Sequence, residues 1–462
     1  IAFVTTSATQ QTIETGGKTL GNTSINTNAN ASYLLNDALT LGSTATLTHG
    51  FGTLNTNGKT VSVGVYNGSS SNTRTLTLGA SNFSVTGTGV VWNFSITTGL
   101  TFNANTSTVS VTDTSSTNKS FVGGGKTFNT VTFSGDNITV SGANTFSSLN
   151  VNNAGLANGL KLTSGVTQTV TTLTTNGSTG SLTKIIASTT SLATISISSG
   201  NIALSWCYLT YIGVTGGATF SASKSFDGGN NSGWASITDQ VVSGGGNSNA
   251  AGTWESGNLP TSRSNLLLTS GSGQLTINAA MACRSLDCTG YTNTLTHNAS
   301  MALTIGDATA GLGNIALKLV SGMTYTLGSA TTSLIRLAST STTQQTVETG
   351  GKTCGNVTFG YTVGSASYLL SDNLTLGSAA TLTHNSGTLN TNSKAVSCGV
   401  FDSSNSNTRT LTLGASVISI TGPGPTSAWA MSTTTGLTLN PGTSEIRITD
   451  TGSSTKPFAG GG

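Results

Sequence analysis

Charged residues are scarce in this chain. Only 7% of its 462 residues are Asp, Glu, Lys or Arg, whereas about a quarter of an ordinary soluble domain is charged. The formal net charge is +3 and there is no basic run, so we expect no nucleic-acid partner, because such binding depends on a basic surface. There is also no run of 18 apolar residues, so we expect no membrane-spanning helix.

Cysteine is rare as well, and its odd number argues against a disulfide scaffold. Comparison of the two repeat copies described below places Cys354 at the position of Leu20 and Cys398 at that of Val63, as expected for small buried hydrophobic residues. Cys283 and Cys288 leave alternatives open: a disulfide, a metal site, or two core residues. No His or second Cys pair stands nearby in the sequence, which favours the core. The five cysteines are Cys207, Cys283, Cys288, Cys354 and Cys398.

Thr, Ser, Asn and Gly make up the bulk of the chain, with 60 glycines and only 5 prolines. Disordered chains combine high charge with few apolar residues. Here 35% of the residues are hydrophobic, and they recur in twos and threes between polar ones. This distribution predicts a thin, elongated core rather than a globular one.

A long internal repeat is the strongest feature of the sequence. TQQTIETGGKTLGN begins at Thr9 and returns as TQQTVETGGKTCGN at Thr343, 334 positions later. YLLNDALTLGSTATLTH from Tyr33 returns as YLLSDNLTLGSAATLTH from Tyr368, 335 positions later. We therefore predict tandem modules of about 335 residues, the period read from this repeat, with both ends of the sequence lying inside a longer array.

The repeat predicts the domain organisation. Residues 1–234 form a β-solenoid that is the C-terminal part of one module, and residues 235–260 form a linker or capping boundary. Residues 261–462 form a β-solenoid that starts the next module, and within it residues 335–462 repeat residues 1–125.

The boundary is placed by composition. The stretch from Asn201 to Trp234 is the most aromatic part of the chain, and a Gly-rich span follows from Ser243. Because exposed end coils of repeat proteins need a cover, we expect the segment that starts at Trp254 to cap the first coil of the next module.

Short runs of alternating apolar and polar residues, separated by Gly, Asn or Ser turns, predict half-buried β-strands. Glycine and asparagine supply tight corners at low cost, and the motifs LTLG (Leu39, Leu76) and TLTH (Thr46, Thr294, Thr381) are expected to stack as ladders. The fold prediction is therefore all-β, a parallel β-helix (β-solenoid) with coils of about 20 residues and outward ladders of Thr, Ser and Asn. An array of β-sandwiches is the alternative.

Several segments together resemble the repetitive β-helical proteins of tailed phages and uncultured bacteria. They are GGKTFNTVTFSG from Gly124, SGANTFSSLNVNN from Ser141, GLKLTSGVTQTVTTLTTNGS from Gly159 and GGATFSASKSFDGGNNSGW from Gly216. The resemblance implies a right-handed parallel β-helix with a structural or attachment role. It transfers no functional residue.

Acidic residues were considered as catalysts, because glycosidases use two carboxylates that face each other across a sugar. Six of the 14 acids recur as matched pairs, which favours turn roles: Glu14 and Glu348, Asp37 and Asp372, Asp113 and Asp450. The others are scattered: Asp136, Asp227, Asp239, Glu255, Asp287, Asp307, Asp402 and Glu445. We therefore predict that the chain is not an enzyme.

Two further candidates favour structural interpretations. His49, His297 and His384 all end TLTH strands, whereas a catalytic triad requires one special histidine. The segment from Asp227 to Asn231 could bind calcium, but it lacks the nonapeptide recurrence of calcium-binding β-rolls, so a polar turn is favoured. We predict no catalytic, metal-binding or cofactor-binding residue.

These observations predict a structural segment of an extracellular or virion-surface fibre, located outside the cell, on a virion or on a cell surface. Its expected partners are further copies of the repeat in the same or neighbouring chains, as a homo-oligomer or filament. One alternative is a bacterial surface adhesin that binds cell-surface glycans through exposed Tyr and Trp. A polysaccharide depolymerase is less favoured.

Overall fold

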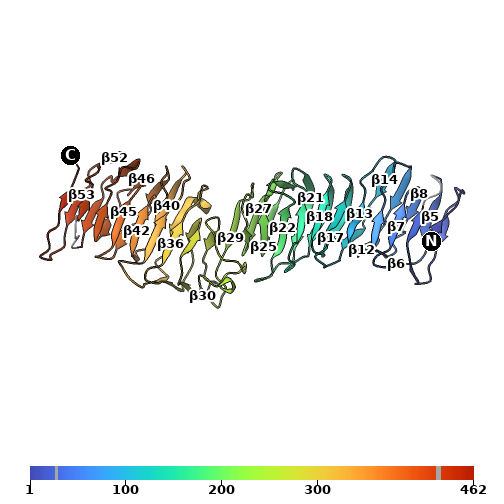
Figure 1. Ribbon diagram of the computed structural model, residues 1–462, viewed down its shortest axis with the longest axis horizontal. Coiled ribbons are helices and arrows are strands. Elements are labelled where there is room, and N and C mark those ends of the chain that lie inside the picture. Colours follow the sequence, from blue (N-terminus) through green and yellow to red (C-terminus); the bar gives the residue numbers. More distant parts are fainter. Residues whose placement is uncertain (26–29, 423–427, 462) are drawn as a thin grey trace. The chain divides into compact units, whose positions relative to one another are not determined.

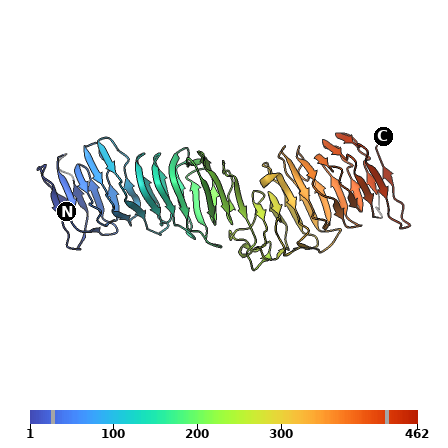
Figure 2. The same cartoon turned by 180° about the vertical axis from the view of Figure 1, so that it is seen from behind.

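The computed structural model describes residues 1–25, 30–422 and 428–461. The chain divides into two compact units, Ile1–Ser236 (unit 1) and Ile237–Gly462 (unit 2), and each is considered by itself. In each unit, strands of successive coils lie side by side (Figures 1 and 2). The described residues contain two short 3-10 helices, η1 (Ala251–Thr253) and η2 (Leu312–Asn314).

The predicted parallel β-helix is confirmed. The two units together contain about 19 turns. In the described residues, all pairs between named strands are parallel. Two isolated bridges outside these strands, Ser178 with Ser181 and Val241 with Trp254, are antiparallel. A β-sandwich would instead require antiparallel sheets that close a separate core.

Unit 1 has three sides, which we call faces A, B and C. Face A contains β1 (Ala2–Phe3), β4 (Thr23–Ile25), β7 (Thr46–His49), β10 (Val65–Asn67), β13 (Gly89–Asn93), β16 (Lys119–Val122), β18 (Ile138–Ser141), β20 (Leu160–Leu162), β22 (Thr183–Ala187), β25 (Cys207–Thr210) and β28 (Phe226–Asp227). Face B contains β2 (Gln11–Ile13), β5 (Ser32–Leu35), β8 (Gly52–Asn55), β11 (Arg74–Thr77) and β14 (Leu100–Asn103), and β24 (Asn201–Ser205) pairs with β27 (Thr219–Ser223) in later coils. Face C contains β3 (Thr19–Leu20), β6 (Leu39–Leu41), β9 (Val61–Val63), β12 (Asn82–Val85), β15 (Thr108–Val111), β17 (Thr127–Phe133), β19 (Thr145–Val151), β21 (Thr167–Thr175), β23 (Ala193–Ser196) and β26 (Ile212–Thr215).

Unit 2 repeats this arrangement, with faces A′, B′ and C′. Face A′ contains β33 (Met281–Cys283), β36 (Ala302–Ile305), β39 (Leu334–Leu337), β42 (Asn356–Phe359), β45 (Thr381–His384), β48 (Val400–Asp402), β51 (Trp429–Ala430) and β54 (Phe458–Ala459). Face B′ contains β29 (Ser236–Asp239), β31 (Asn265–Leu267), β34 (Ser285–Asp287), β37 (Ile315–Lys318), β40 (Gln344–Glu348), β43 (Ser367–Leu370), β46 (Gly387–Asn390), β49 (Arg409–Thr412) and β52 (Leu437–Asn440). Face C′ contains a first sheet of β30 (Gly246–Asn247), β32 (Leu275–Ile277), β35 (Thr294–His297) and β38 (Thr324–Leu327), and a second of β41 (Thr353–Cys354), β44 (Leu374–Leu376), β47 (Val396–Cys398), β50 (Val417–Ile420) and β53 (Glu445–Ile448).

The length of a coil varies more than predicted. The next strand on the same face follows after 18 residues where Leu209 pairs with Asp227, and after 31 residues where Leu286 pairs with Leu317. The strands stay short throughout, so the extra residues of the longer coil form corner loops, including the one that contains η2. Corner loops are therefore the places where surface features can be built.

Alternation along each strand divides inside from outside. In β6, for example, Leu39 and Leu41 are buried while Thr40 between them is only half-buried, because successive side chains of a strand point to opposite faces. The parallel register keeps like residues in line and produces the predicted outward ladder. On face C this ladder consists of Thr19, Thr40, Ser62, Ser84, Ser110, Thr132, Asn150 and Thr174.

The prediction that the LTLG and TLTH motifs stack as ladders is wrong. The TLTH strands that begin at Thr294 and Thr381 lie on faces C′ and A′ of unit 2. The LTLG motif at Leu39 forms β6 on face C, whereas the motif at Leu76 belongs to β11 on face B. The spacing of 37 positions exceeds the coil length in this region, where Leu76 pairs with Leu54, 22 positions earlier. The chain therefore reaches a different face by the time the motif recurs, and the two copies cannot stack on each other.

Glycines mark one corner where backbones of successive coils come very close. A Cβ atom on Gly87 would lie 2.6 Å from the carbonyl oxygen of Gly64, and one on Gly422 would lie 2.7 Å from the Cα of Gly399. These two glycine pairs occupy matching positions in the two repeat copies. The close stacking leaves no room for a side chain at either site.

The span predicted as a linker or cap, residues 235–260, contains β29, β30 and η1, and the chain passes from unit 1 to unit 2 within it, after Ser236. Trp254 is fully buried in the core of unit 2 with Val241 and Leu266, and its Nε1 donates to the Ser248 carbonyl at 3.2 Å. The assignment of this span as a module boundary stays a prediction.

Candidate functional site

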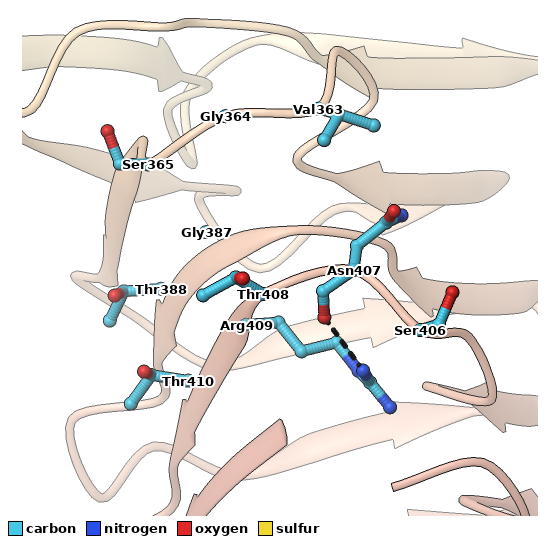
Figure 3. A pocket seen from close by; sticks show the side chains of 10 residues that line it. All are labelled: Val363, Gly364, Ser365, Gly387, Thr388, Ser406, Asn407, Thr408, Arg409 and Thr410. Atoms are coloured by element: carbon cyan, nitrogen blue, oxygen red, sulfur yellow. Dashed lines mark hydrogen bonds between the residues drawn. The ribbon is translucent and has the colours of Figure 1, made fainter. Parts of the chain in front are cut away.

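A groove lies on face B′ of unit 2. Its floor comes from β46 and β49, where Thr388 and Thr410 lie directly opposite each other in register and point outward. The corner loops that precede β43 and β49 form its walls, and its cavity volume is about 530 Å³. Figure 3 shows Ser365, Thr388 and Thr410 along one side and Val363, Asn407 and Ser406 along the other.

The wall that precedes β49 is held by the buried side chain of Arg409, which is 1% exposed. Its Nη1 donates to the carbonyls of Asn407 and Thr435 at 3.0 and 3.1 Å. Its Nη2 donates to the carbonyls of Ser403 and Thr433 at 2.5 and 2.6 Å. One guanidinium, a rigid fork with five donors, thus ties the corner loops of two successive coils together.

The first repeat copy contains the same arrangement around Arg74, which is also 1% exposed. Its Nε donates to the Gly68 carbonyl at 2.7 Å, and its Nη1 donates to the carbonyls of Asn72 and Thr98. Its Nη2 donates to the Ile96 carbonyl at 2.6 Å. The recurring NTRTLTLG motif therefore encodes a loop clamp, which the sequence alone showed only as a repeat.

Behind the first clamp, Gly68 makes room for two aromatic rings. A Cβ atom on Gly68 would lie 2.8 Å from Cε1 of Phe94 and 3.0 Å from the hydroxyl oxygen of Tyr66. That hydroxyl lies 3.1 Å from Nδ1 of His49. A side chain at position 68 therefore cannot coexist with these two rings in their present places.

The second copy solves the same packing problem with different residues. Ser403 stands where the first copy has its glycine, Phe401 replaces the tyrosine, and Met431 replaces the phenylalanine. The serine hydroxyl accepts a hydrogen bond from the Nε of Arg409 at 2.9 Å, and the Nδ1 of His384 is left without a partner. The three substitutions are complementary, since a phenylalanine without the hydroxyl and a flexible, unbranched methionine leave space for the added Cβ.

We expect Gly68→Ser alone to destabilise unit 1 by about 1–3 kcal/mol, as overpacking of a core does. The triple variant Gly68→Ser, Tyr66→Phe, Phe94→Met should recover most of this loss, apart from about 1 kcal/mol for the missing tyrosine hydrogen bond. Urea unfolding followed by circular dichroism measures both. A triple variant no more stable than the single one would refute the compensation.

The three histidines face the interior and are each 0% exposed. Burial lowers the pKa of His49 and of His384 to about 4, and it also lowers that of His297. In each ring Nε2 must donate, because its partner is a carbonyl oxygen, which only accepts. These acceptors are the carbonyls of Gly52, Met301 and Gly387.

Acid should therefore weaken the fold. Between the ordinary histidine pKa of 6.5 and the folded value of about 4 for His49 and His384, the unfolded chain binds more protons, so stability present above pH 6.5 is lost as the pH falls. His49 and His384 each contribute up to about 3 kcal/mol to this loss. Thermal melts from pH 7 to pH 4 test it. The variant His49→Gln should flatten the dependence, and an unchanged slope would contradict this account.

Two scattered acids, Asp239 and Glu255, come together in unit 2, which the sequence did not reveal. An antiparallel bridge between Val241 and Trp254 brings their segments side by side, and the two carboxyls are 4% and 8% exposed. The Ser256 N–H donates to Asp239 at 3.1 Å. Burial above all, with a smaller effect of the Glu255 charge, raises the pKa of Asp239 to about 6.

A raised pKa means that the ionised carboxyl is the disfavoured form in the folded chain. The stability that Asp239 contributes is present below the unfolded pKa and is lost as the pH rises through about 6. We expect Asp239→Asn to stabilise unit 2 at pH 8 by roughly 1–3 kcal/mol and to give no gain at pH 4. Asp37→Asn is the control. Backbone hydrogen bonds lower the pKa of Asp37 and so favour its ionised form, and we therefore expect this variant to destabilise unit 1 at pH 8. A gain for Asp239→Asn that did not depend on pH would contradict this explanation.

Matched acids have the turn roles predicted for them. Asp37 accepts the backbone N–H groups of Thr15 and Gly16 at 2.9 and 2.7 Å. Its counterpart Asp372 accepts the N–H of Thr349 at 2.8 Å. Both carboxylates thus stabilise the same tight turn of the preceding coil.

Another matched pair of acids holds a lysine. Asp113 lies 2.8 Å from Nζ of Lys119, and Asp450 lies 3.0 Å from Nζ of Lys456. Glu14 accepts a side-chain hydrogen bond from Asn36. Six unmatched acids each bond to a nearby backbone N–H or basic side chain: Asp136, Asp227, Asp287, Asp307, Asp402 and Glu445.

The segment considered for calcium forms a polar turn. The carboxylate of Asp227 accepts the Gly229 N–H at 2.9 Å and the side-chain amide of Asn231 at 2.7 Å. In residues 1–25, 30–422 and 428–461, no group of three or more His, Cys, Asp or Glu side chains could hold a metal ion.

All five cysteines are free and buried, so Cys283 and Cys288 are not joined to each other. Burial raises the pKa of the Cys283 thiol to about 12 and that of Cys288 still further above its ordinary value. Both lie in the hydrophobic core of unit 2. Their packing matches the core interpretation.

No family model, no curated protein and no solved structure matches the chain. In the part of the chain that the structure describes, no helix is long and apolar enough to cross a membrane. The functional proposal therefore rests on the repeat and on the geometry of the two units.

Proposed function

We propose that this chain is a structural segment of an extracellular or virion-surface fibre, in which stacked coils set length. The observation that carries the proposal is that the repeated segments, residues 1–125 and 335–462, fold into the same succession of coils. The series from β2 to β16 in unit 1 and from β40 to β54 in unit 2 place equivalent residues on equivalent faces. A module that folds alike wherever it recurs suits an extendable array.

Packing between coils supports this. Trp92 and Phe121 lie opposite each other on neighbouring strands of face A, and their rings stack with centroids 5.8 Å apart. Both are 0% exposed. Each coil thus offers an apolar surface to its neighbour, so stacking stabilises both.

Electron microscopy of the native particle or cell surface, with an antibody against this chain, tests the proposal. We expect labelling along narrow rods whose length increases with the number of modules encoded. Labelling confined to compact particles, or to the cell interior, would refute it.

The depolymerase alternative lacks support from the groove. Its described lining contains no carboxylate. Asp239 and Glu255, the two acids that lie close to each other, are buried and do not belong to this lining. The adhesin alternative relied on exposed aromatic rings. Among the described Tyr and Trp residues Tyr361 is the exposed one, at 45%, and the Arg336 guanidinium covers its ring at 4.5 Å.

A further inference from the structure

The groove on face B′ carries hydroxyls that no internal partner uses. Within the described residues, none of its serine and threonine hydroxyls makes an intramolecular hydrogen bond. Val363, 63% exposed, adds an apolar surface on the side opposite Ser365, Thr388 and Thr410 (Figure 3). The lining hydroxyls are those of Ser365, Thr388, Ser406, Thr408 and Thr410.

The described lining of the groove also offers no uncommitted charged group to a ligand. Arg409 is the one charged residue in its described lining, and its guanidinium is committed to the backbone of two corner loops. The Asn407 amide nitrogen is likewise committed, to the carbonyl and side-chain oxygens of Asn385, both at 3.1 Å. A phosphate, sulfate or carboxylate would find no free cation here to form the charge-assisted hydrogen bonds that hold such groups most strongly.

Other ligand classes fit poorly. An extended peptide binds a sheet by pairing with a free strand edge, but β46 and β49 are already paired on both sides. A nucleobase needs an aromatic ring to stack on, and the described lining has none. A lipid chain needs an apolar floor, whereas this floor is built from Thr388 and Thr410.

A sugar fits these properties. Saccharide hydroxyls both donate and accept, as the serine and threonine hydroxyls of the groove do, and the C–H face of a sugar ring can pack on Val363. The volume of about 530 Å³ lies within the range of about 300–1,000 Å³ usual for small-ligand sites. We infer that the groove on face B′ binds a short stretch of an uncharged polysaccharide.

The floor of the site recurs with the module. Thr388 and Thr410 correspond to Thr53 and Thr75 in the first copy, and the clamping arginine corresponds to Arg74. Residues 26–29, which match part of the wall, lie outside the described residues.

The test uses the whole chain and a panel of oligosaccharides in isothermal titration calorimetry. Neutral probes are maltotetraose, cellotetraose, mannotetraose and chitotetraose, and acidic comparators are tetragalacturonate and a hyaluronan tetrasaccharide. We expect binding of at least one neutral probe and none of the acidic ones. The double variant Thr388→Val, Thr410→Val should weaken it about tenfold, because two hydrogen bonds are lost while shape is kept.

Thr375→Val is the matched control, since Thr375 points outward on face C′ and should leave affinity unchanged. Circular dichroism confirms that both variants are folded. Absence of binding to every neutral probe, preference for an acidic probe, or equal affinity of the double variant and the control would each overturn the inference. None of these outcomes bears on the fibre proposal, which the microscopy tests separately.

Discussion

Replacing Arg409 with alanine is expected to lower the free energy of unfolding of unit 2 by about 3–5 kcal/mol, because it leaves several buried backbone carbonyls without a donor. The arginine is 1% exposed, so water reaches these oxygens poorly. Its partners belong to two successive coils, the loops around Ser403 and Thr433. Loss of the guanidinium should therefore separate the loops and deform the groove wall.

Hydrogen exchange measured by mass spectrometry locates this effect. Amides of residues 403–408 and 431–436 should exchange much faster in Arg409→Ala, and sugar binding should be lost together with this protection. Arg447→Ala is the control, because Arg447 and its partner Glu445 are more than half exposed, and exposed ion pairs contribute little. An Arg409→Ala variant as stable as this control would rule out the clamp.

Trp92→Ala should destabilise unit 1 by about 3–5 kcal/mol, as the loss of a large buried ring does. Trp92 is 0% exposed and lies at the centre of an aromatic cluster. The nearest rings have centroids 4.7 Å away at Tyr66 and 5.2 Å away at Phe83. Phe121 of the next coil stacks on it at 5.8 Å, so the cavity would disrupt packing between coils as well as within one.

The variant Trp92→Phe separates the contribution of ring packing from that of the indole N–H group. The indole Nε1 of Trp92 has no hydrogen-bond partner, so its removal relieves an unsatisfied buried donor, and phenylalanine keeps most of the ring. We expect a loss well below that of alanine, measured by urea unfolding. If the phenylalanine and alanine variants were equally unstable, the packing explanation would fail.

The fold was predictable because two independent patterns agree. Alternation such as that of Leu39, Thr40 and Leu41 indicates strands with one buried face, and a repeat of about 335 residues requires a module that stacks on itself. What could not be predicted is the side on which a strand lies. The strands of Leu39 and Leu76 share a motif yet belong to different faces, because loop length between them decides how far round the coil the chain has travelled.

The site was less accessible to sequence reasoning. The motif around Asn407 and Arg409 was visible only as a repeat, because nothing in the sequence says that the arginine turns inward to bind carbonyls. The groove combines loops about 40 residues apart, and its walls depend on coil register. Asp239 and Glu255 were likewise judged separate, since an antiparallel bridge inside a parallel fold leaves no periodic signal.

The unequal lengths of the coils have a mechanical consequence. Within a unit, the ladder hydrogen bonds run along the stacking direction, so a pull in that direction loads the bonds of all sides of a coil at once. When a coil unfolds, it releases 18 to 32 residues, about 60–110 Å of extended chain. Each coil is therefore a reserve of chain length that absorbs a sudden force when it unfolds, and the coils with the longest corner loops release the most chain.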